Sequence, residues 1–194
     1  QNAPTWQADA TVSGATDKSD YYLSAGAMSQ EGNAPFSSMS RFTLLTKLNT
    51  QVTNWFKVGV NLNLTYQDIE TTGFSGTANS IYNPMFMATQ MLPWMLPYEY
   101  TENPDGTLTM GDRREYFDEM SQYNTIYLQE IQPSGRNVAR ISGNLYQQFT
   151  PVKGLTLRAV QALNANDQRS TGKANPVGPF VGDGSASESF SRYY

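Results

Sequence analysis

Apolar and polar side chains alternate through residues 41–67 of this 194-residue chain. The apolar members stand at even positions on both sides of a short break at 53–54: Phe42, Leu44, Leu48, Val52, Phe56, Val58, Val60, Leu62, Leu64 and Tyr66. On the arm before the break, Leu45 is the one apolar residue at an odd position. A period of two indicates β-strand, and about a dozen residues on each arm is twice the usual strand length. The pattern predicts an antiparallel hairpin of two unusually long strands.

Two further hairpins follow the same rule. Residues 138–150 alternate and lead through a turn at 151–154, which contains Pro151 and Gly154, into Leu155, Leu157 and Ala159. A weaker hairpin precedes them, with a polar turn at 16–20 and Tyr21, Leu23, Ala25 and Ala27 on its apolar face. With a partial strand at 188–194, we expect roughly seven strands.

The connections alternate between tight and long. Tight turns are expected at 16–20, 53–54 and 151–154, and longer connections at 32–39, 71–136 and 167–187. Long strands with short turns on one side and long loops on the other are typical of outer-membrane up-and-down barrels. Aromatic residues near strand ends, such as Tyr21, Tyr22, Trp55, Phe56, Tyr66 and Phe149, fit the same class. The expected fold is therefore all-β: a long antiparallel meander that is a portion of a transmembrane up-and-down β-barrel.

Residues 71–136 are too many for a plain hairpin loop and carry helix signals of their own. Asn83 before Pro84 predicts a capped helix that ends before Pro93, and Asp112 with Glu115 predicts a cap for a second short helix. The sequence "NPDG" at 103–106 predicts a turn. We expect strands in 1–70, a long extracellular loop with short helices in 71–136, and strands with an outer loop in 137–194.

Composition excludes most catalytic chemistry. The chain has no Cys and no His, so it cannot build a catalytic triad, a thiol nucleophile or a Cys/His zinc site. The carboxylates Asp112, Glu115, Asp118 and Glu119 have the spacing of a solvated helix face as much as that of an acid–base pair. A net charge of −4 argues against a nucleic-acid partner. We expect no enzyme, no metal and no cofactor.

Aromatic residues of the long loop are the candidate ligand-binding residues: Trp94, Tyr98, Tyr100 and Tyr82. Exposed rings can stack on sugars or hold peptide side chains. The alternative is that rings and methionines pack the loop's own core, which is favoured for Phe86, Met87 and Met91 and is open for Trp94. On the strands, Lys47, Asn61, Asn63, Arg140, Asn144 and Arg158 are expected to line a wet lumen.

Three segments carry a resemblance to a known family: "TVSGATDKSDYYLSAGAMSQEG", "RFTLLTKLNTQVTNWFKVGVNLNLT" and "RISGNLYQQFTPVKGLTLRA". Their order is similar to that in SusC-like TonB-dependent transporters of the Gram-negative outer membrane. The resemblance implies import of glycans or other oligomers, with a SusD-like surface lipoprotein as partner. It also implies an oligosaccharide or peptide substrate, contact with outer-membrane lipid, and contact with TonB through a region absent from this chain.

The chain departs from that family in extent. Members resemble one another in having a signal, a plug domain and a TonB-contacting segment ahead of a barrel of about 22 strands, and none of these precedes Gln1. We therefore expect a portion of a larger barrel. The alternative is a soluble β-sandwich carbohydrate-binding module whose two apolar faces meet each other, which would be monodisperse without detergent.

Overall fold

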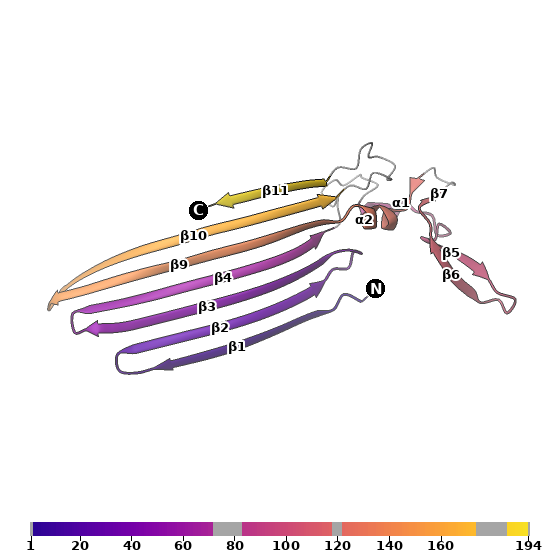
Figure 1. Ribbon diagram of the computed structural model, residues 1–194. Coiled ribbons are helices and arrows are strands. Elements are labelled where there is room, and N and C mark those ends of the chain that lie inside the picture. The colour runs from indigo at the N-terminus through magenta and orange to yellow at the C-terminus, as the bar shows by residue number, and fades with distance from the viewer. Residues whose placement is uncertain (1, 72–82, 118–121, 174–185, 194) are drawn as a thin grey trace.

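The computed structural model describes residues 2–71, 83–117, 122–173 and 186–193. Seven long strands form one antiparallel sheet in the order β1-β2-β3-β4-β9-β10-β11 (Figure 1). The strands are β1 (Thr5–Ala15), β2 (Ser19–Glu31), β3 (Ser38–Thr53), β4 (Phe56–Thr71), β9 (Ser134–Val152), β10 (Leu155–Lys173) and β11 (Ala186–Tyr193). The predicted long antiparallel meander is confirmed. Within the described residues the sheet is open, with β1 and β11 at its edges.

Strand lengths exceed the expectation. β3 and β4 have 16 residues each, and β9 and β10 have 19 each. β9 begins at Ser134 because its polar first residues still pair through their backbone with the end of β4, where Thr71 lies opposite Ser134. Sequence alternation misses such residues because the backbone, and not the side chain, makes the contact.

The tight turns lie together at one end of the sheet and the long connections at the other (Figure 1). In the first turn the Thr16 hydroxyl accepts hydrogen bonds from the N–H groups of Lys18 and Ser19, at 3.4 and 3.1 Å. In the last, Gly154 has φ of 91°, a conformation that glycine adopts without a Cβ clash. The asymmetry that the sequence predicted is thus present.

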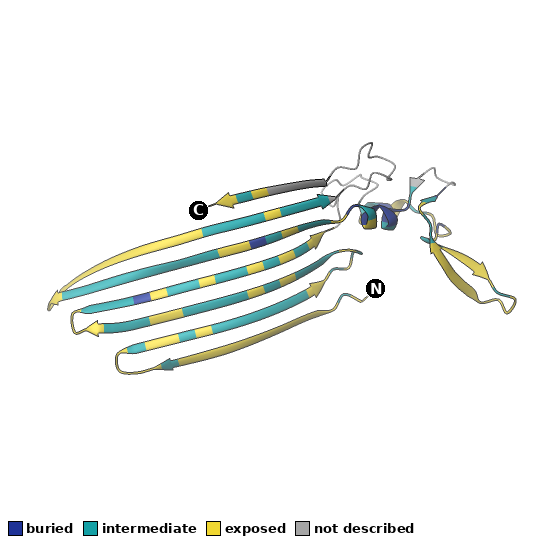
Figure 2. Ribbon diagram, viewed as in Figure 1, coloured by how far each residue is buried: buried dark blue, intermediate teal, exposed yellow. Residues whose placement is uncertain are grey.

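Register places the apolar side chains of neighbouring strands on a common face. Leu44 lies opposite Leu64, Leu64 opposite Ile141, and Ile141 opposite Ala165. These strands are exposed or half-buried along most of their length (Figure 2), and Phe42 and Leu163 remain 50% and 55% exposed. The described residues form one large sheet with nothing packed on this apolar face, so the two facing sheets of the sandwich alternative are not formed.

The opposite face is polar and internally hydrogen-bonded. Asn61 Nδ2 donates to Asn144 Oδ1 at 2.8 Å, and the Tyr146 hydroxyl donates to Asn49 Oδ1 at 2.7 Å. The guanidinium of Arg158 lies 4.5 Å from the centre of the Tyr146 ring. Tyr22 also belongs to this face, opposite Lys47, so it is not part of an aromatic band on the apolar face.

Smaller elements fold the long loop: α1 (Pro84–Gln90), β5 (Tyr98–Glu102), β6 (Leu108–Arg113), β7 (Tyr116–Phe117), β8 (Gln122–Tyr123) and α2 (Thr125–Ile131). The helix predicted after Asp112 and Glu115 is wrong. Asp112 lies in β6, and the residues after Glu115 form β7, whose Tyr116 pairs with Tyr123 of β8. Asp118 and Glu119 lie outside the described residues. The second helix begins later, after Asn124.

Buried apolar side chains concentrate in this loop. Five of them form what we call the loop core: Met87, Met95, Phe117, Tyr127 and Leu128, each at most 8% exposed. In the sheet, Val138 is the buried apolar residue of the described part. The loop is therefore a folded cap at one end of an otherwise uncovered sheet. None of the helices in the described ranges is both long and apolar enough to cross a membrane.

Candidate functional site

The first helix of the loop forms as its sequence predicts. The side chain of Asn83 accepts hydrogen bonds from the N–H groups of Met85 and Phe86, at 3.0 and 3.3 Å, and Pro84 occupies the first turn. Met87 is buried, which confirms its assignment to the loop core, whereas Phe86 and Met91 are half-buried. α1 thus fixes the position of the segment that follows it.

Trp94 lies in the turn after α1 and is not one of the buried residues of the loop core. The N–H of Met95 donates to the carbonyl of Leu92 at 2.9 Å, and this turn buries Met95 to 4% exposure. The neighbouring Trp94 is 66% exposed. A tryptophan held by a turn with its ring in solvent does not contribute to core packing, which decides the open question for this residue against the core.

The tyrosines lie on β5, next to this turn in the chain. Tyr98 pairs with Arg113 and is half-buried, whereas Tyr100 pairs with Met110 and is 40% exposed. Within the described residues, no ring contact joins Trp94, Tyr98 and Tyr100 to one another. Tyr82 lies outside the described residues. The structure therefore presents Trp94 and Tyr100 as separate exposed rings on one folded loop.

The hairpin of β5 and β6 closes with the predicted turn. The N–H of Gly106 donates to the carbonyl of Asn103 at 2.9 Å, and Gly106 has φ of 78°. The hydroxyl and backbone N–H of Thr107 both donate to the carboxylate of Asp105, and these bonds hold the pKa of Asp105 below its usual value. Sequence reasoning identified the turn but not the two strands that it joins.

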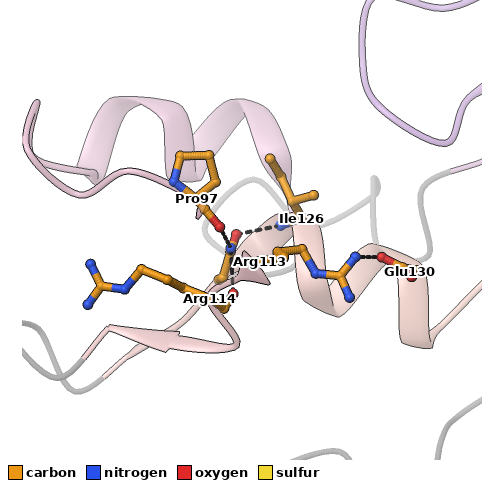
Figure 3. Close-up of polar contacts among 6 residues, drawn as sticks. Pro97, Arg113, Arg114, Ile126 and Glu130 are labelled. Atoms are coloured by element: carbon orange, nitrogen blue, oxygen red, sulfur yellow. Dashed lines mark hydrogen bonds and ion pairs between the residues drawn. The ribbon is translucent and has the colours of Figure 1, made fainter. Parts of the chain in front are cut away.

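A buried asparagine that sequence reasoning missed ties the loop together. Asn124 is 1% exposed, and its Nδ2 donates to the carbonyls of Pro97 and Arg114, at 3.0 and 2.7 Å (Figure 3). Its Oδ1 accepts from the N–H of Ile126 and so caps α2. An Asn directly before an apolar helical stretch was the available signal. No sequence pattern reveals the two carbonyls from distant segments.

Charged side chains hold β6 against α2. Arg113 forms an ion pair with Glu130 (Figure 3), and its guanidinium lies 5.4 Å from the ring centre of Tyr127. Burial, together with the negative charge of Glu115, raises the pKa of the Tyr127 hydroxyl. Tyr127 is 8% exposed and packs between β6 and α2 as a neutral ring, which both the ordinary and the raised pKa allow near pH 7.

The loop exposes many large apolar side chains. We call them the loop apolar surface: Met85, Leu92, Trp94, Leu96, Tyr100, Leu108 and Met110, all 40–66% exposed. The hairpin of β5 and β6 is exposed along nearly its whole length (Figure 2). Apolar surface on a folded loop typically marks a contact region for a ligand or a partner. Among the described residues, no cluster of carboxylates could hold a metal ion, and Asp112 and Glu115 are both exposed.

Comparison with known proteins identifies relatives by sequence. No protein-family model matches the chain. It is 26% identical to "TonB-dependent receptor P3" of Formosa agariphila over 187 residues, which is 93% of this chain and 17% of that protein. It is also 29% identical to "TonB-dependent receptor P26" of the same bacterium over 79 residues, 41% of this chain and 8% of that protein. The chain therefore spans less than a fifth of these receptors.

Solved structures of the RagAB peptide importer share the fold. In the "open-open" state the match has a TM-score of 0.74 at 23% identity, over 98% of this chain and 20% of that one. In the "closed-closed" state the TM-score is 0.70 over 98% of this chain and 21% of that one. Together with the receptor sequences, these matches confirm the resemblance inferred from the three sequence segments.

Replacing Asn124 tests its role as the tie of the loop. Asn124→Ala removes the side-chain donor that the carbonyls of Pro97 and Arg114 share, a loss of about 1–3 kcal/mol of loop stability, while the carbonyl of Pro97 keeps the N–H of Arg114 as a donor. We expect faster hydrogen exchange both in α2 and at the N–H of Arg114, which bonds to Pro97. The matched control Asn83→Ala removes the half-buried cap of α1 and should speed exchange in that helix. Faster exchange confined to the first turn of α2 would show that Asn124 only caps this helix and does not join it to the segments of Pro97 and Arg114.

Proposed function

We propose that this chain, a portion of a SusC-like TonB-dependent transporter, forms part of the wall and outer mouth of an outer-membrane importer of oligomeric nutrients. The proposed cell is a Gram-negative bacterium, and the proposed cargo is an oligosaccharide or a peptide. The chain would work beside a SusD-like surface lipoprotein and would receive energy from TonB through a region outside this chain. The relatives are named as receptors and importers, which supports transport without enzymatic activity.

The main support for this proposal is the height of the apolar band, by which we mean the stretch of apolar side chains on one face of the sheet. On β4 the band runs from Phe56 at the tight-turn end to Tyr66 near the long-loop end. A strand rises about 3.3 Å per residue and barrel strands tilt by about 45°, so the band is about 23–25 Å tall. That height matches the apolar belt of about 25 Å in outer-membrane barrels. Trp55, Phe56 and Phe149 stack at one margin, with ring centres 4.6–6.2 Å apart, as an aromatic girdle does.

The polar face supports the lumenal assignment. Lys47, Asn61, Asn63, Arg140, Asn144 and Arg158 all have the register of this face. A barrel wall that faces lipid on one side and water on the other needs this division between faces. Hydrogen bonds such as Asn61 to Asn144 keep the polar side chains ordered without removing them from water.

The long loop is proposed to meet the cargo. Its exposed rings Trp94 and Tyr100, with Tyr98 and Tyr82, are the proposed ligand-binding residues. A ring on a folded support loses little conformational freedom when it stacks on a sugar or holds a peptide side chain. The exposure of Trp94, 66%, on a turn that follows α1 is the observation that supports this site.

The proposed orientation in the membrane leads to a prediction about thiol labelling. Single changes Lys18→Cys and Lys153→Cys lie in tight turns, and Glu102→Cys lies in the β5–β6 hairpin of the long loop. Because barrels of this type keep short turns in the periplasm, an impermeant thiol reagent on intact cells should label only Glu102→Cys. All three should react in lysed cells, which is the control. Labelling of the turn variants on intact cells would refute the orientation.

The second prediction concerns Trp94. Cells that express the full-length transporter with Trp94→Ala should take up a labelled tryptic digest, or a labelled oligosaccharide mixture, at least about tenfold more slowly, since a stacked ring is worth about 1.4 kcal/mol or more. The matched control is Trp55→Ala, because Trp55 is also exposed but lies at the tight-turn end. Both variants also carry Glu102→Cys, and the uptake of each is divided by its thiol labelling on intact cells. Uptake is then compared for equal amounts of transporter at the cell surface. Equal uptake by the two variants would remove Trp94 from the site.

A further inference from the structure

Charged side chains are divided between the two faces of the sheet. The strands β3, β4, β9 and β10 contain three carboxylates, and register places all of them on the apolar face: Asp68, Glu70 and Asp167. The polar face of the same strands carries cations instead: Arg41, Lys47, Lys57, Arg136, Arg140 and Arg158. The whole chain has a net charge of −4. This part of the polar face is therefore opposite in sign to the molecule as a whole.

Carboxylates of the neighbouring strands β1 and β2 lie close to part of this charge. Asp9 lines a small hollow together with Arg41. Asp20 lies two residues along β2 from Tyr22, the partner of Lys47. These carboxylates offset the charge of the two β3 cations. The remaining four cations, which we call the cationic wall, lie on β4, β9 and β10: Lys57, Arg136, Arg140 and Arg158.

The contacts of the cationic wall are with neutral groups. The guanidinium of Arg158 lies over the Tyr146 ring, and Arg140 Nε donates to Asn166 Oδ1 at 3.4 Å. Within the described residues none of the four cations forms an ion pair, and the three arginines of the wall are exposed. A guanidinium has five N–H donors, so one neutral contact leaves donors for an anion. The wall therefore presents uncompensated positive charge.

A polar hollow lies between the two ends of the cationic wall. Its volume is about 330 Å³, within the range of about 300–1,000 Å³ that is usual for small-molecule sites. Amide and hydroxyl groups make up its polar lining: Asn61, Asn63, Ser142, Asn144 and Asn164. In the described part of the chain, the side-chain amides of Asn63 and Asn164 have no hydrogen-bond partner. The hollow thus offers neutral donors and acceptors close to Arg140, which lies two residues from Ser142 on β9.

We propose that the lumen bounded by this wall prefers an anionic cargo, an oligomer that bears carboxylates along its length. The inference rests on the proposed function, because it requires the polar face to line the lumen. Carboxylates of the cargo bind the exposed arginines, and its neutral polar groups bind the amides of the hollow. A passage lined by charge of one sign raises the local concentration of oppositely charged molecules, and Arg and Lys line pores that select anions.

The spread of the cationic wall favours a moving cargo over a docked protein. Arg136 and Arg140 lie near the long-loop end, whereas Lys57 and Arg158 share a row near the tight turns. That row crosses β9 at Gln148, about 40 Å along the strand from Arg136. A cargo that crosses the membrane passes both ends of the wall in turn. A protein docked at one level meets only one of them.

Uptake of matched acidic and neutral probes by cells with the full-length transporter tests the proposal. One pair is a labelled oligogalacturonate and its methyl ester. The other is a labelled peptide rich in glutamate and the same peptide with glutamine at those positions. In each pair the charge changes while the size stays nearly the same, and the two pairs distinguish an oligosaccharide cargo from a peptide cargo. Uptake is divided by surface labelling of Glu102→Cys.

Two double variants separate the polar face from the apolar face. Arg136→Gln with Arg140→Gln removes two cations of the wall. Arg169→Gln with Arg192→Gln is the matched control, because these arginines have the register of the apolar face. Their rows lie between those of Arg136 and Arg140, so the two variants remove equal charge at the same height of the sheet.

The expected result is that wild-type protein takes up one acidic probe at least about fivefold faster than its neutral counterpart. The wall variant should reduce this preference to about twofold or less without slowing the neutral probe, and the control variant should keep it. Equal uptake of acidic and neutral probes by wild-type protein would overturn the inference, and so would an unchanged preference in the wall variant. Equal slowing of both probes would assign the cations to contacts within the transporter. Failure to import any of the four probes would instead count against the proposed function itself.

Discussion

A β-sheet with one continuous apolar face must have that face covered, and this constraint governs the whole structure. Side chains alternate between faces along a strand, so the even-numbered apolar residues of β3 and β4 meet the apolar residues of β9 and β10 on one side. A soluble protein covers such a face with a second layer. Here the described residues supply one large sheet, and the height of its apolar face supports the proposal that lipid covers it.

The long loop differs from the sheet because it has a buried core of its own. It lies at the end of the sheet and holds its own fold with a small core. Buried Asn124 compensates by joining three segments through hydrogen bonds, and Arg113 joins β6 to α2 through Glu130. Because these polar ties stabilise the fold, the loop can leave Trp94 and Tyr100 exposed instead of burying them.

Local rules predicted what depends on local structure. The alternation located the long strands, Asn83 and Pro84 located α1, and "NPDG" located a turn, because each feature acts within a few residues of itself. The helix expected after Asp112 failed because strand pairing between Tyr116 and Tyr123 outweighed a capping pattern. The contacts of Asn124 depend on residues far apart in sequence, Pro97 and Arg114, which a single sequence does not reveal.

Solvent accessibility along β4 tests the central claim most directly. Nitroxide labels are placed one at a time from Lys57 to Tyr66 in the full-length transporter reconstituted into vesicles, and their relaxation by oxygen and by a water-soluble nickel chelate is measured. Oxygen accumulates in lipid, so oxygen accessibility should be high at Val58, Val60, Leu62 and Leu64 and low at the odd positions between them. Low accessibility to both reagents at those even positions would mean that the face is packed against protein, and would contradict a wall that faces lipid.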